Sequence, residues 1–341
     1  EPILAVPRGA RRWVDGTLLV SSGHAALDGV VGGGLAAGSV TLLEPDWRGI
    51  LNDMQEVGRV MCLTRNEHCV HERHGHFEGV DVKPPHGIVL GPDIDLRLFL
   101  GSWKHGFAVR EPLREGKRLS LQFFDGTGEA VHKIYATEET DRPAFDALIA
   151  RYAAATPPDL KIVARATDSV DRPDSEIDVA GVRAAWLGMK DTHEFFGMLG
   201  KFKVGRVQAL RLVGGDLARE LPVRALRAAF EAASADGTPI MVFVGSHGCI
   251  QIHTGPVKRL VETHGWFNVL DPDFNMHLRE VGIARVFSVR KPTEDGIVTS
   301  IEAFDARNRN ILLMFGARKP GKPELEEWRG IVANVEKQAA S

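Results

Sequence analysis

The second half of the chain repeats the first half at a constant spacing, and this repetition limits the possible folds more than any other feature. When the sequence is shifted by 180 positions, residues 61–155 align with 241–335 without a gap. The identical pairs include Met61/Met241, Cys69/Cys249, Gly75/Gly255, Phe107/Phe287, Pro112/Pro292, Gly116/Gly296, Asp125/Asp305 and Pro143/Pro323. Matches at turns and at alternating apolar positions, in one register, predict one fold used twice.

The two repeats differ in charge at a few aligned positions. Lys291 aligns with Glu111, Arg318 with Glu138, and His277 with Arg97. Two acids in one repeat are therefore two bases in the other. A scaffold alone does not require this asymmetry, so we interpret it as a sign of one anionic ligand bound between unequal halves.

Length and composition indicate a soluble globular protein. The chain has 341 residues, which suits two domains or one pseudo-symmetric double domain, and a formal net charge of −3, which argues against general nucleic-acid binding. Three cysteines, Cys62, Cys69 and Cys249, provide no disulfide framework and suit a reducing compartment. No basic-then-apolar signal peptide opens the chain, and polar residues and glycines interrupt the apolar stretch 17–43. We therefore expect a cytoplasmic protein without membrane insertion.

Each repeat is predicted to be a meander of strands followed by a helix, giving an α+β double domain. In the second repeat the expected strands are Ile240–Val244, Cys249–His253, Ile283–Arg290, Ile297–Phe304 and Ile311–Phe315. Pro323 is expected at the first position of the closing helix, with glutamates in the opening turn, and Pro143 takes the same place in the first repeat. The predicted halves are 1–155, whose first 46 or so residues match poorly, and 179–341, joined by a polar linker at 156–178.

A helical region at the start of the second half contains the first candidate ligand, His193. Residues 179–189 place apolar side chains on one helical face, and Asp191–Glu194 has the pattern of a capping box. His193 is expected in the opening turn of the next helix, where the helix dipole disfavours the imidazolium and leaves a lone pair for a metal. Phe195, Phe196, Met198 and Leu199 form an apolar surface that could contact a flat cofactor. The alternative is a histidine that only caps or packs.

Two further groups could contact a ligand. Arg206, Lys291 and Arg318 suit carboxylates or phosphates, although solvated surface charge is the usual role of such residues. Arg97 and Phe99 alternate on a predicted strand and would point to the same side, either into a pocket or onto the surface.

A histidine-rich segment suggests a different kind of site. Residues 68–76 contain His68, Cys69, His71, His74 and His76, yet their spacing matches no standard zinc motif. A metal-dependent hydrolase built here would need a carboxylate base and an open metal position, and neither is identifiable. The chain also lacks Cys-x-x-Cys-His, which excludes covalent haem attachment by pattern, and it has no nucleotide-binding glycine motif in a strand–turn–helix context.

Several long motifs resemble the HemS/HmuS-type bacterial haem-utilisation proteins, from about Trp47 to the end of the chain. They are Leu63–His71, Gly248–Val257, Trp266–Asn275, Arg290–Thr293 and Phe315–Gly321. One departure is that some relatives carry tyrosines near the haem where this chain has Leu312 and Phe315.

The resemblance implies a tandem duplication with two large antiparallel β-sheets, flanked by helix pairs, and a haem cleft between the halves. It implies non-covalent haem b with iron ligated by His193, and Arg97 with Phe99 beside it on the distal side, where Arg97 would be the catalytic residue. Arg206, Lys291 and Arg318 would bind the propionates. Members of this family are assigned haem carriage or oxidative ring opening, so a carrier without turnover and a haem-degrading enzyme both remain open. An inner-membrane haem importer or a downstream haem oxygenase is the implied partner. A purely structural or protein-binding tandem sheet is a further alternative.

Overall fold

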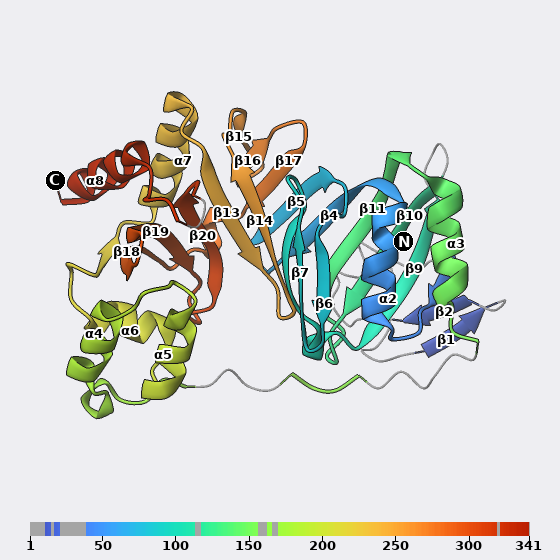
Figure 1. Ribbon diagram of the computed structural model, residues 1–341, viewed down its shortest axis with the longest axis horizontal. Helices are drawn as coiled ribbons and strands as arrows, with labels where there is room; N and C mark the ends of the chain where they lie inside the picture. The colour runs from blue at the N-terminus through green and yellow to red at the C-terminus, as the bar shows by residue number, and fades with distance from the viewer. Residues whose placement is uncertain are drawn as a thin grey trace. The chain divides into compact units, whose positions relative to one another are not determined.

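The computed structural model describes residues 11–14, 17–20, 39–112, 117–155, 162–165, 170–318 and 321–340 (Figure 1). Over these residues the strands form two nine-stranded sheets and a separate ribbon of β1 (Arg11–Val14) and β2 (Thr17–Val20). The chain folds into two compact units. The first contains 1–65, 72–166 and 246–251, and the second contains 66–71, 167–245 and 252–341.

In the first unit, strands in the order β4-β11-β10-β9-β3 form one run and β8-β7-β6 form another. The strands are β3 (Ser39–Leu42), β4 (Gly58–Arg65), β6 (Val80–Lys83), β7 (His86–Leu90), β8 (Asp95–Phe99), β9 (His105–Pro112), β10 (Lys117–Phe124) and β11 (Ala130–Thr140). The helices are α2 (Trp47–Asp53), α3 (Arg142–Tyr152) and the short η1 (Met54–Glu56) and η2 (Leu100–Ser102). Strands β5 (Cys69–Gly75) and β14 (Cys249–Gly255) each contribute residues to both units.

The helix pair of the first unit covers one face of its sheet (Figure 1). Asp141 caps α3 by accepting a hydrogen bond from the amide of Ala144 at 3.0 Å, and Pro143 lies in the first turn as predicted. Along β10, Leu121 and Phe123 belong to the core that contains the α2 and α3 side chains. Because side chains alternate along a strand, Ser120 and Gln122 point to the opposite face.

In the second unit the corresponding strand orders are β12-β18-β19-β20-β13 and β15-β16-β17. The strands are β12 (Ala218–Leu221), β13 (Ile240–Gly245), β15 (Leu260–Thr263), β16 (Trp266–Leu270), β17 (Phe274–Leu278), β18 (Arg285–Thr293), β19 (Gly296–Phe304) and β20 (Asn310–Gly316). The helices are α4 (Val179–Leu187), α5 (Glu194–Phe202), α6 (Arg206–Leu212), α7 (Arg224–Asp236) and α8 (Glu326–Ala340), with the short η3 (Asp174–Glu176) and η4 (Glu280–Gly282).

The sheet of the second unit has a core on each face. Val286 of β18 packs in the core with α7 and α8, whereas Phe287 and Val289 pack with α4, α5 and α6. Figure 1 shows α7 with α8 in one group and α4, α5 and α6 in another. A strand covered on both sides is apolar at successive positions, as the sequence Val286-Phe287 is.

The duplicated fold is confirmed, as are the two antiparallel sheets with helix pairs. Three pairs of strands begin and end at positions that differ by the repeat spacing of 180 residues: β5 and β14, β6 and β15, and β7 and β16. The five strands predicted in the second repeat are present, at positions within three residues of the predicted ends.

The predicted start of the last helix is wrong. Helix α8 begins at Glu326, so Pro323 precedes the helix. The reason is the contact made by Glu324, whose Oε1 accepts a hydrogen bond from the backbone N–H of Thr299 in β19 at 2.7 Å. This hydrogen bond holds Glu324 against the sheet, two residues before the first residue of α8.

The division into residues 1–155 and 179–341 stays a prediction. Of the predicted linker, residues 156–161 and 166–169 lie outside the described part of the chain. Among the described residues, no helix has the length and apolarity needed to cross a bilayer.

Candidate functional site

Helix α5 begins one residue after His193, and reciprocal hydrogen bonds hold this start. Asp191 Oδ1 accepts from the backbone N–H of His193 at 2.8 Å, and Glu194 Oε1 accepts from the backbone N–H of Asp191 at 3.1 Å. The predicted capping box is therefore present. His193 is the residue before the helix, however, and does not lie in its opening turn.

The imidazole of His193 is exposed and is oriented by a carboxylate. Its Nδ1 lies 2.5 Å from Asp191 Oδ1, and the side chain is 88% exposed. The backbone hydrogen bond from His193 is the main cause that lowers the pKa of Asp191, and the charge of Arg318 contributes. A carboxylate on one ring nitrogen fixes the ring and leaves Nε2 as the outward ligand atom, as in many metal-binding histidines.

The apolar residues after His193 do not form one continuous surface, contrary to the prediction. Phe195, Met198 and Leu199 are buried in the core with α4 and α6, whereas Phe196 is 81% exposed. Positions three and four apart share a helix face, so Phe196 points away from the other three. The exposed ring therefore lies on the outer side of α5.

A buried ionic cluster lies beneath Phe195. Glu302 Oε1 accepts hydrogen bonds from Lys291 Nζ at 2.8 Å and from Ser300 Oγ at 2.9 Å, and Arg206 Nη2 lies 2.8 Å from its Oε2. Lys291 Nζ and the Arg206 guanidinium lie 4.5 and 5.1 Å from the centre of the Phe195 ring. The cluster thus connects the sheet to the first turn of α5.

The cluster keeps its carboxylate ionised. Burial raises the pKa of Glu302, but Arg206 and Lys291 outweigh this effect and lower it to about 2. Burial also lowers the pKa of Lys291, and the attraction of Glu302 opposes that shift. We infer that the ion pair is charged at neutral pH, because two cations and a hydroxyl surround one carboxylate.

Glu302 also changes the interpretation of the charge difference between the repeats. It aligns with Gln122, so a new acid accompanies the new base Lys291. Lys291 is only 3% exposed and already has this internal partner. The exchange of Glu111 for Lys291 therefore does not by itself require an external anion, contrary to our interpretation of the sequence. The comparison of the repeats could have identified Glu302, because the difference at 122 and 302 is visible in the same alignment.

Arg318 has a looser environment than the other two cations. Its nearest carboxylate, that of Asp295, is 3.7 Å away, and the side chain is 20% exposed. Its charge contributes to the lowered pKa of Asp191, the residue that holds the His193 ring. Four of the six predicted site residues, His193, Arg206, Lys291 and Arg318, thus lie in the second unit.

Arg97 and Phe99 belong to the first unit and lie on β8, as predicted. Arg97 forms an ion pair with Asp95, and its side chain is 34% exposed. Phe99 is 38% exposed, and its ring makes an edge contact with His86. At the repeat position of Arg97, the Nδ1 of His277 instead forms a 2.7 Å hydrogen bond with Asn268.

Of the two positions at which the resemblance led us to expect tyrosine, Leu312 and Phe315, only Phe315 lies on the face with the ionic cluster. Leu312 is buried in the core with α7 and α8. Phe315 is paired with Ser300 in the ladder and contacts Phe243 at a centroid distance of 5.1 Å. Replacing tyrosine by Phe315 thus removes a hydroxyl from this face.

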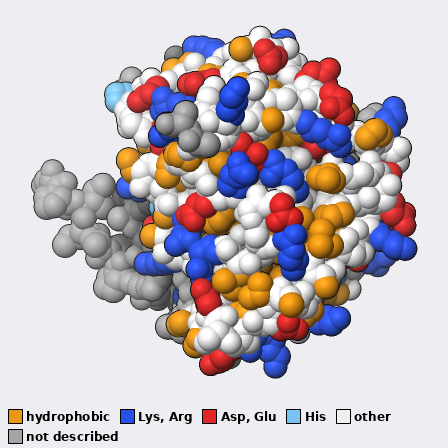
Figure 2. Space-filling model, turned by 90° about the vertical axis from the view of Figure 1, so that its left-hand side faces the viewer, with side chains coloured by type: hydrophobic (Ala, Val, Ile, Leu, Met, Phe, Trp, Pro, Cys, Tyr) orange, Lys and Arg blue, Asp and Glu red, His pale blue; other side chains and the backbone are white. Residues whose placement is uncertain are grey.

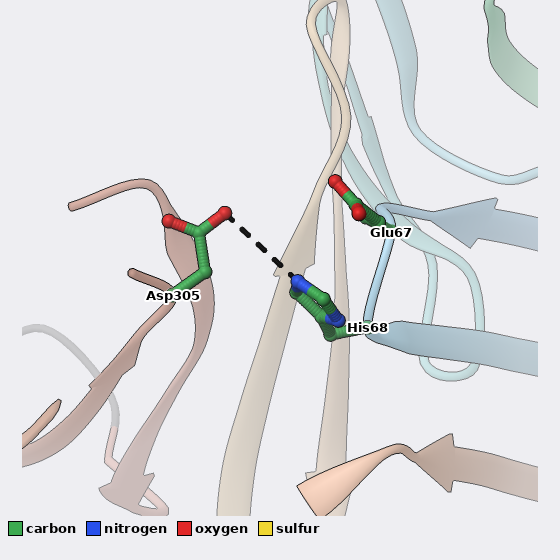
Figure 3. A group of neighbouring side chains, drawn as sticks. All are labelled: Glu67, His68 and Asp305. Atoms are coloured by element: carbon green, nitrogen blue, oxygen red, sulfur yellow. Dashed lines mark ion pairs between the residues drawn. The ribbon is translucent and has the colours of Figure 1, made fainter. Parts of the chain in front are cut away.

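The histidine-rich segment does not form one metal site. His71 is fully buried and packs on Phe274, whereas His76 is exposed. In the part of the chain that the structure describes, the group of metal-capable side chains that converge is Glu67, His68 and Asp305, with one histidine of the segment (Figure 3). His68 Nε2 lies 3.9 Å from Asp305 Oδ2.

An arginine already neutralises the two acids of this group. Arg309 Nη2 donates to Glu67 at 2.7 Å, and Arg309 Nε donates to Asp305 at 2.8 Å. Asp305 Oδ1 also accepts from two backbone amides of its own turn, and Asp125 does the same at the equivalent turn of the first repeat. An aspartate therefore has the same structural role in both repeats, and a divalent cation at Asp305 would compete with Arg309.

The surface of the second unit carries mixed charge. Figure 2 shows lysine and arginine side chains interspersed with aspartate and glutamate on the face that contains α4 and α8. Among the ion pairs of the second unit are Arg183–Asp216 and Arg211–Asp174. This face has no uniform basic patch of the kind that binds nucleic acid.

Comparisons with known proteins agree with the motifs. The family model described as "Haemin-degrading HemS.ChuX domain" matches residues 31–152 and 203–335. The hemin transport protein HemS of Yersinia enterocolitica is 39% identical over 294 residues, which covers 86% of this chain and 85% of that protein.

Solved structures with the same fold include two well-matched relatives. Holo-PhuS, a heme-binding protein from Pseudomonas aeruginosa, is 47% identical with a TM-score of 0.82 and covers 86% of each chain. ChuS, an E. coli heme oxygenase, is 38% identical with a TM-score of 0.80 and covers 87% of this chain and 88% of its own.

Proposed function

The chain belongs to the HemS family, and from this we propose that it binds haem non-covalently and takes part in bacterial haem-iron utilisation. The observation that carries the proposal is the start of α5. It holds an exposed histidine with a carboxylate on Nδ1, and basic side chains lie in the same unit. These groups match a ligand that combines a metal ion with carboxylates.

The residues of the second unit have distinct proposed roles. His193 would bind the iron through Nε2, with Asp191 holding the ring. Arg318, the most weakly paired of the three cations, would bind a propionate directly, as would the partly exposed Arg206. Lys291 would contribute positive charge from beneath Phe195, because its ammonium is shared with Glu302.

For Arg97 and Phe99 the roles rest on the sequence match. Arg97 would place a hydrogen-bond donor on the distal side, and Phe99 would pack on the porphyrin. Haem, when bound, supplies the iron redox chemistry that ring opening needs. An arginine that donates to the distal ligand would make Arg97 the catalytic residue, if the chain turns haem over.

Carriage and degradation are both represented among the relatives. HemS of Yersinia enterocolitica is named a transport protein, and E. coli ChuS is described as a heme oxygenase. We propose a haem carrier that can also open the ring, with carriage alone as the second candidate. The proposal includes a cytoplasmic location, for which three free thiols are the support, and a haem importer or a haem oxygenase as partner.

Titration of the apo-protein with haemin tests the proposal. We expect a sharp Soret band that saturates at one equivalent, and His193→Ala should lose the wild-type spectrum. His76→Ala is the matched control, because it removes an exposed histidine from the histidine-rich segment. If no Soret band forms, the haem proposal is wrong; if His193→Ala keeps the wild-type spectrum, the ligand assignment is wrong.

The loaded protein with a reductant and oxygen then separates the two candidate functions. Catalase is added so that free peroxide cannot destroy the haem. Loss of the Soret band with release of iron would support ring opening. An unchanged band, together with transfer of haem to apomyoglobin, would support carriage alone.

A further inference from the structure

The first unit contains three buried polar side chains whose hydrogen-bonding groups are not all used within the described residues. They are Gln122 on β10 and Lys133 and Tyr135 on β11, with exposures of 1%, 3% and 7%. Gln122 Oε1 is a buried atom without a hydrogen-bond partner, and within the described part of the chain no hydrogen bond or ion pair engages Lys133 Nζ or Tyr135 Oη. Native proteins satisfy nearly all buried polar groups, so three together point to a missing partner.

The register of the strands places these groups side by side. Gln122 is directly opposite Lys133, and Ser120 is directly opposite Tyr135. Directly opposed side chains lie on one face with Cβ atoms about 5 Å apart. This face is the one turned away from α2 and α3, and it corresponds to the face of the second unit that α4, α5 and α6 cover.

Apolar residues flank the polar groups on the same face. Leu63 of β4 is opposite Lys133, and Phe107 of β9 is opposite Gln122. Phe107 also packs with Val109 and Phe124 in a small separate cluster. A molecule bound here would therefore meet apolar surface on both sides of its polar group.

Charges of both signs surround the group, and the ammonium of Lys133 is the one on the buried face. Burial lowers the pKa of Lys133 to about 8; Glu111 opposes this shift, whereas Arg65 and Arg118 contribute to it. Burial raises the pKa of Tyr135 to about 12, so its hydroxyl stays a donor at neutral pH, with Glu111 and Glu72 adding to the shift. Arg118, whose side chain is 47% exposed, lies 3.8 Å from Glu111.

The second unit shows how the same fold neutralises a buried lysine. There Lys291, also 3% exposed, is paired with Glu302. Gln122 occupies the repeat position of Glu302, whereas Lys133 aligns with Leu313 and Glu111 with Lys291, so the first unit buries its lysine on a different strand and has an amide at the position of the Glu302 carboxylate. An external carboxylate could therefore take the place that Glu302 fills in the second unit.

We propose that this face of the first unit binds the carboxylate of an apolar organic acid through Lys133, Tyr135 and Gln122. Gln122 Nε2 now donates to Ser120 Oγ at 3.0 Å. With its amide turned, Gln122 would accept from Ser120 and offer Nε2 to the ligand, since a half-turn of the amide exchanges the positions of its oxygen and nitrogen. Ammonium, phenol and amide then supply three donors to one carboxylate. The site shares no residue with the proposed haem ligands, and its proposal does not rest on the proposed function.

Calorimetric titration of the full chain with hexanoate tests the site, with hexan-1-ol as the uncharged control ligand. We expect one hexanoate per chain and no binding of the alcohol. Lys133→Met should weaken hexanoate binding about tenfold or more, the scale of a hydrogen bond to a charged group. Gln122→Glu should abolish it, because an internal carboxylate would fill the place. Lys83→Met is the control, since that lysine side chain is 82% exposed.

A second measurement follows Lys133 itself by NMR of isotope-labelled lysine side chains. Hexanoate and Gln122→Glu should each raise the pKa of Lys133 from about 8, because each supplies a negative charge. This measurement remains informative if Lys133→Met does not fold. His193→Ala should leave hexanoate binding unchanged, which separates this site from the haem proposal.

Three outcomes would overturn the proposal. One is no hexanoate binding to the wild-type chain together with an unshifted Lys133. Another is binding that survives both Lys133→Met and Gln122→Glu, which would place the ligand elsewhere. The third is equal binding of hexan-1-ol, which would show an apolar site without carboxylate recognition.

Discussion

The charged side chains of the second unit differ in how strongly they are paired within the protein, and this difference decides which of them can contact a ligand. Glu302 is fully buried and engages two of the three predicted cations. Arg318 has only a 3.7 Å contact with Asp295. The residue with the weakest internal partner loses least when it turns to a new anion, so Arg318 is the best candidate for direct contact with a haem carboxylate.

Replacement of Arg318 tests this assignment. Arg318→Ala should weaken haemin binding by about 1.5–3 kcal/mol, the range for a hydrogen bond between charged groups. Titration with haemin dimethyl ester should give the same affinity for the variant and the wild type. An equal loss for both ligands would show that Arg318 does not recognise a carboxylate.

Glu302 should make the stability of the protein depend on acid pH. Its pKa falls from 4.5 in the unfolded chain to about 2 in the folded protein, so its stabilising effect is complete above 4.5 and is lost as the pH falls to about 2. Glu302→Gln should remove this dependence and lower the free energy of unfolding by about 3 kcal/mol at neutral pH, because it leaves two buried cations without their acid. Urea unfolding at several pH values measures both effects. A variant with wild-type stability at neutral pH and an unchanged acid profile would contradict the prediction.

At the scale of elements, Asp191 at the start of α5 has two roles, in capping the helix and in orienting His193. Asp191 hydrogen-bonds the backbone of His193 and also holds its ring. Asp178 has only the first role at α4, where it accepts from the amide of Gly181 at 2.9 Å. The two aspartates therefore form a matched pair that separates helix capping from orientation of the ligand.

Substitution of each aspartate tests this separation. Asp191→Ala and Asp178→Ala should each lower the free energy of unfolding by about 1 kcal/mol, the usual value of a capping aspartate. Only Asp191→Ala should also change the haem spectrum and weaken haem binding. If both variants bind haem like the wild type, Asp191 does not orient His193.

At the scale of the whole molecule, the duplication kept the fold and changed the charges that the fold buries. The same sheet face carries Lys133 with Gln122 in the first unit and Lys291 with Glu302 in the second. Strand register and apolar alternation set the backbone, and they leave the polar positions of this face free to differ. One scaffold can therefore present two different binding surfaces.

The three cysteines give a test of the packing of both units. Cys62, Cys69 and Cys249 are fully buried and free. Burial, with a contribution from Cys249, raises the pKa of Cys62, and burial raises that of Cys249 to about 12. A thiol reagent at pH 8 should label none of them in the native protein and all three in denaturant, because the thiolate is the reactive form. Rapid labelling of any cysteine in the native protein would contradict the described packing.

The local pattern of the sequence predicted much of the fold and the capping box, because turns, caps and strand alternation depend on neighbours in the chain. The duplication was predictable because identical turn and apolar residues recur along the chain at a spacing of 180. The start of α8 could not be predicted this way, because Glu324 is held by Thr299 in a distant strand. The surroundings of His68 could not be predicted either. Its side chain lies beside that of Asp305, which is far away in the sequence.

The sequence by itself determined the repeat, its strands and the family to which the chain belongs, since these follow from local order along the chain. Only the tertiary structure decided which charges are already paired. Lys291 and Arg318 look alike in the alignment, yet one is buried against Glu302 and the other has a loose partner. The physical reason is that the state of a charge depends on burial and on partners that folding brings from other strands, and no spacing along the chain records them.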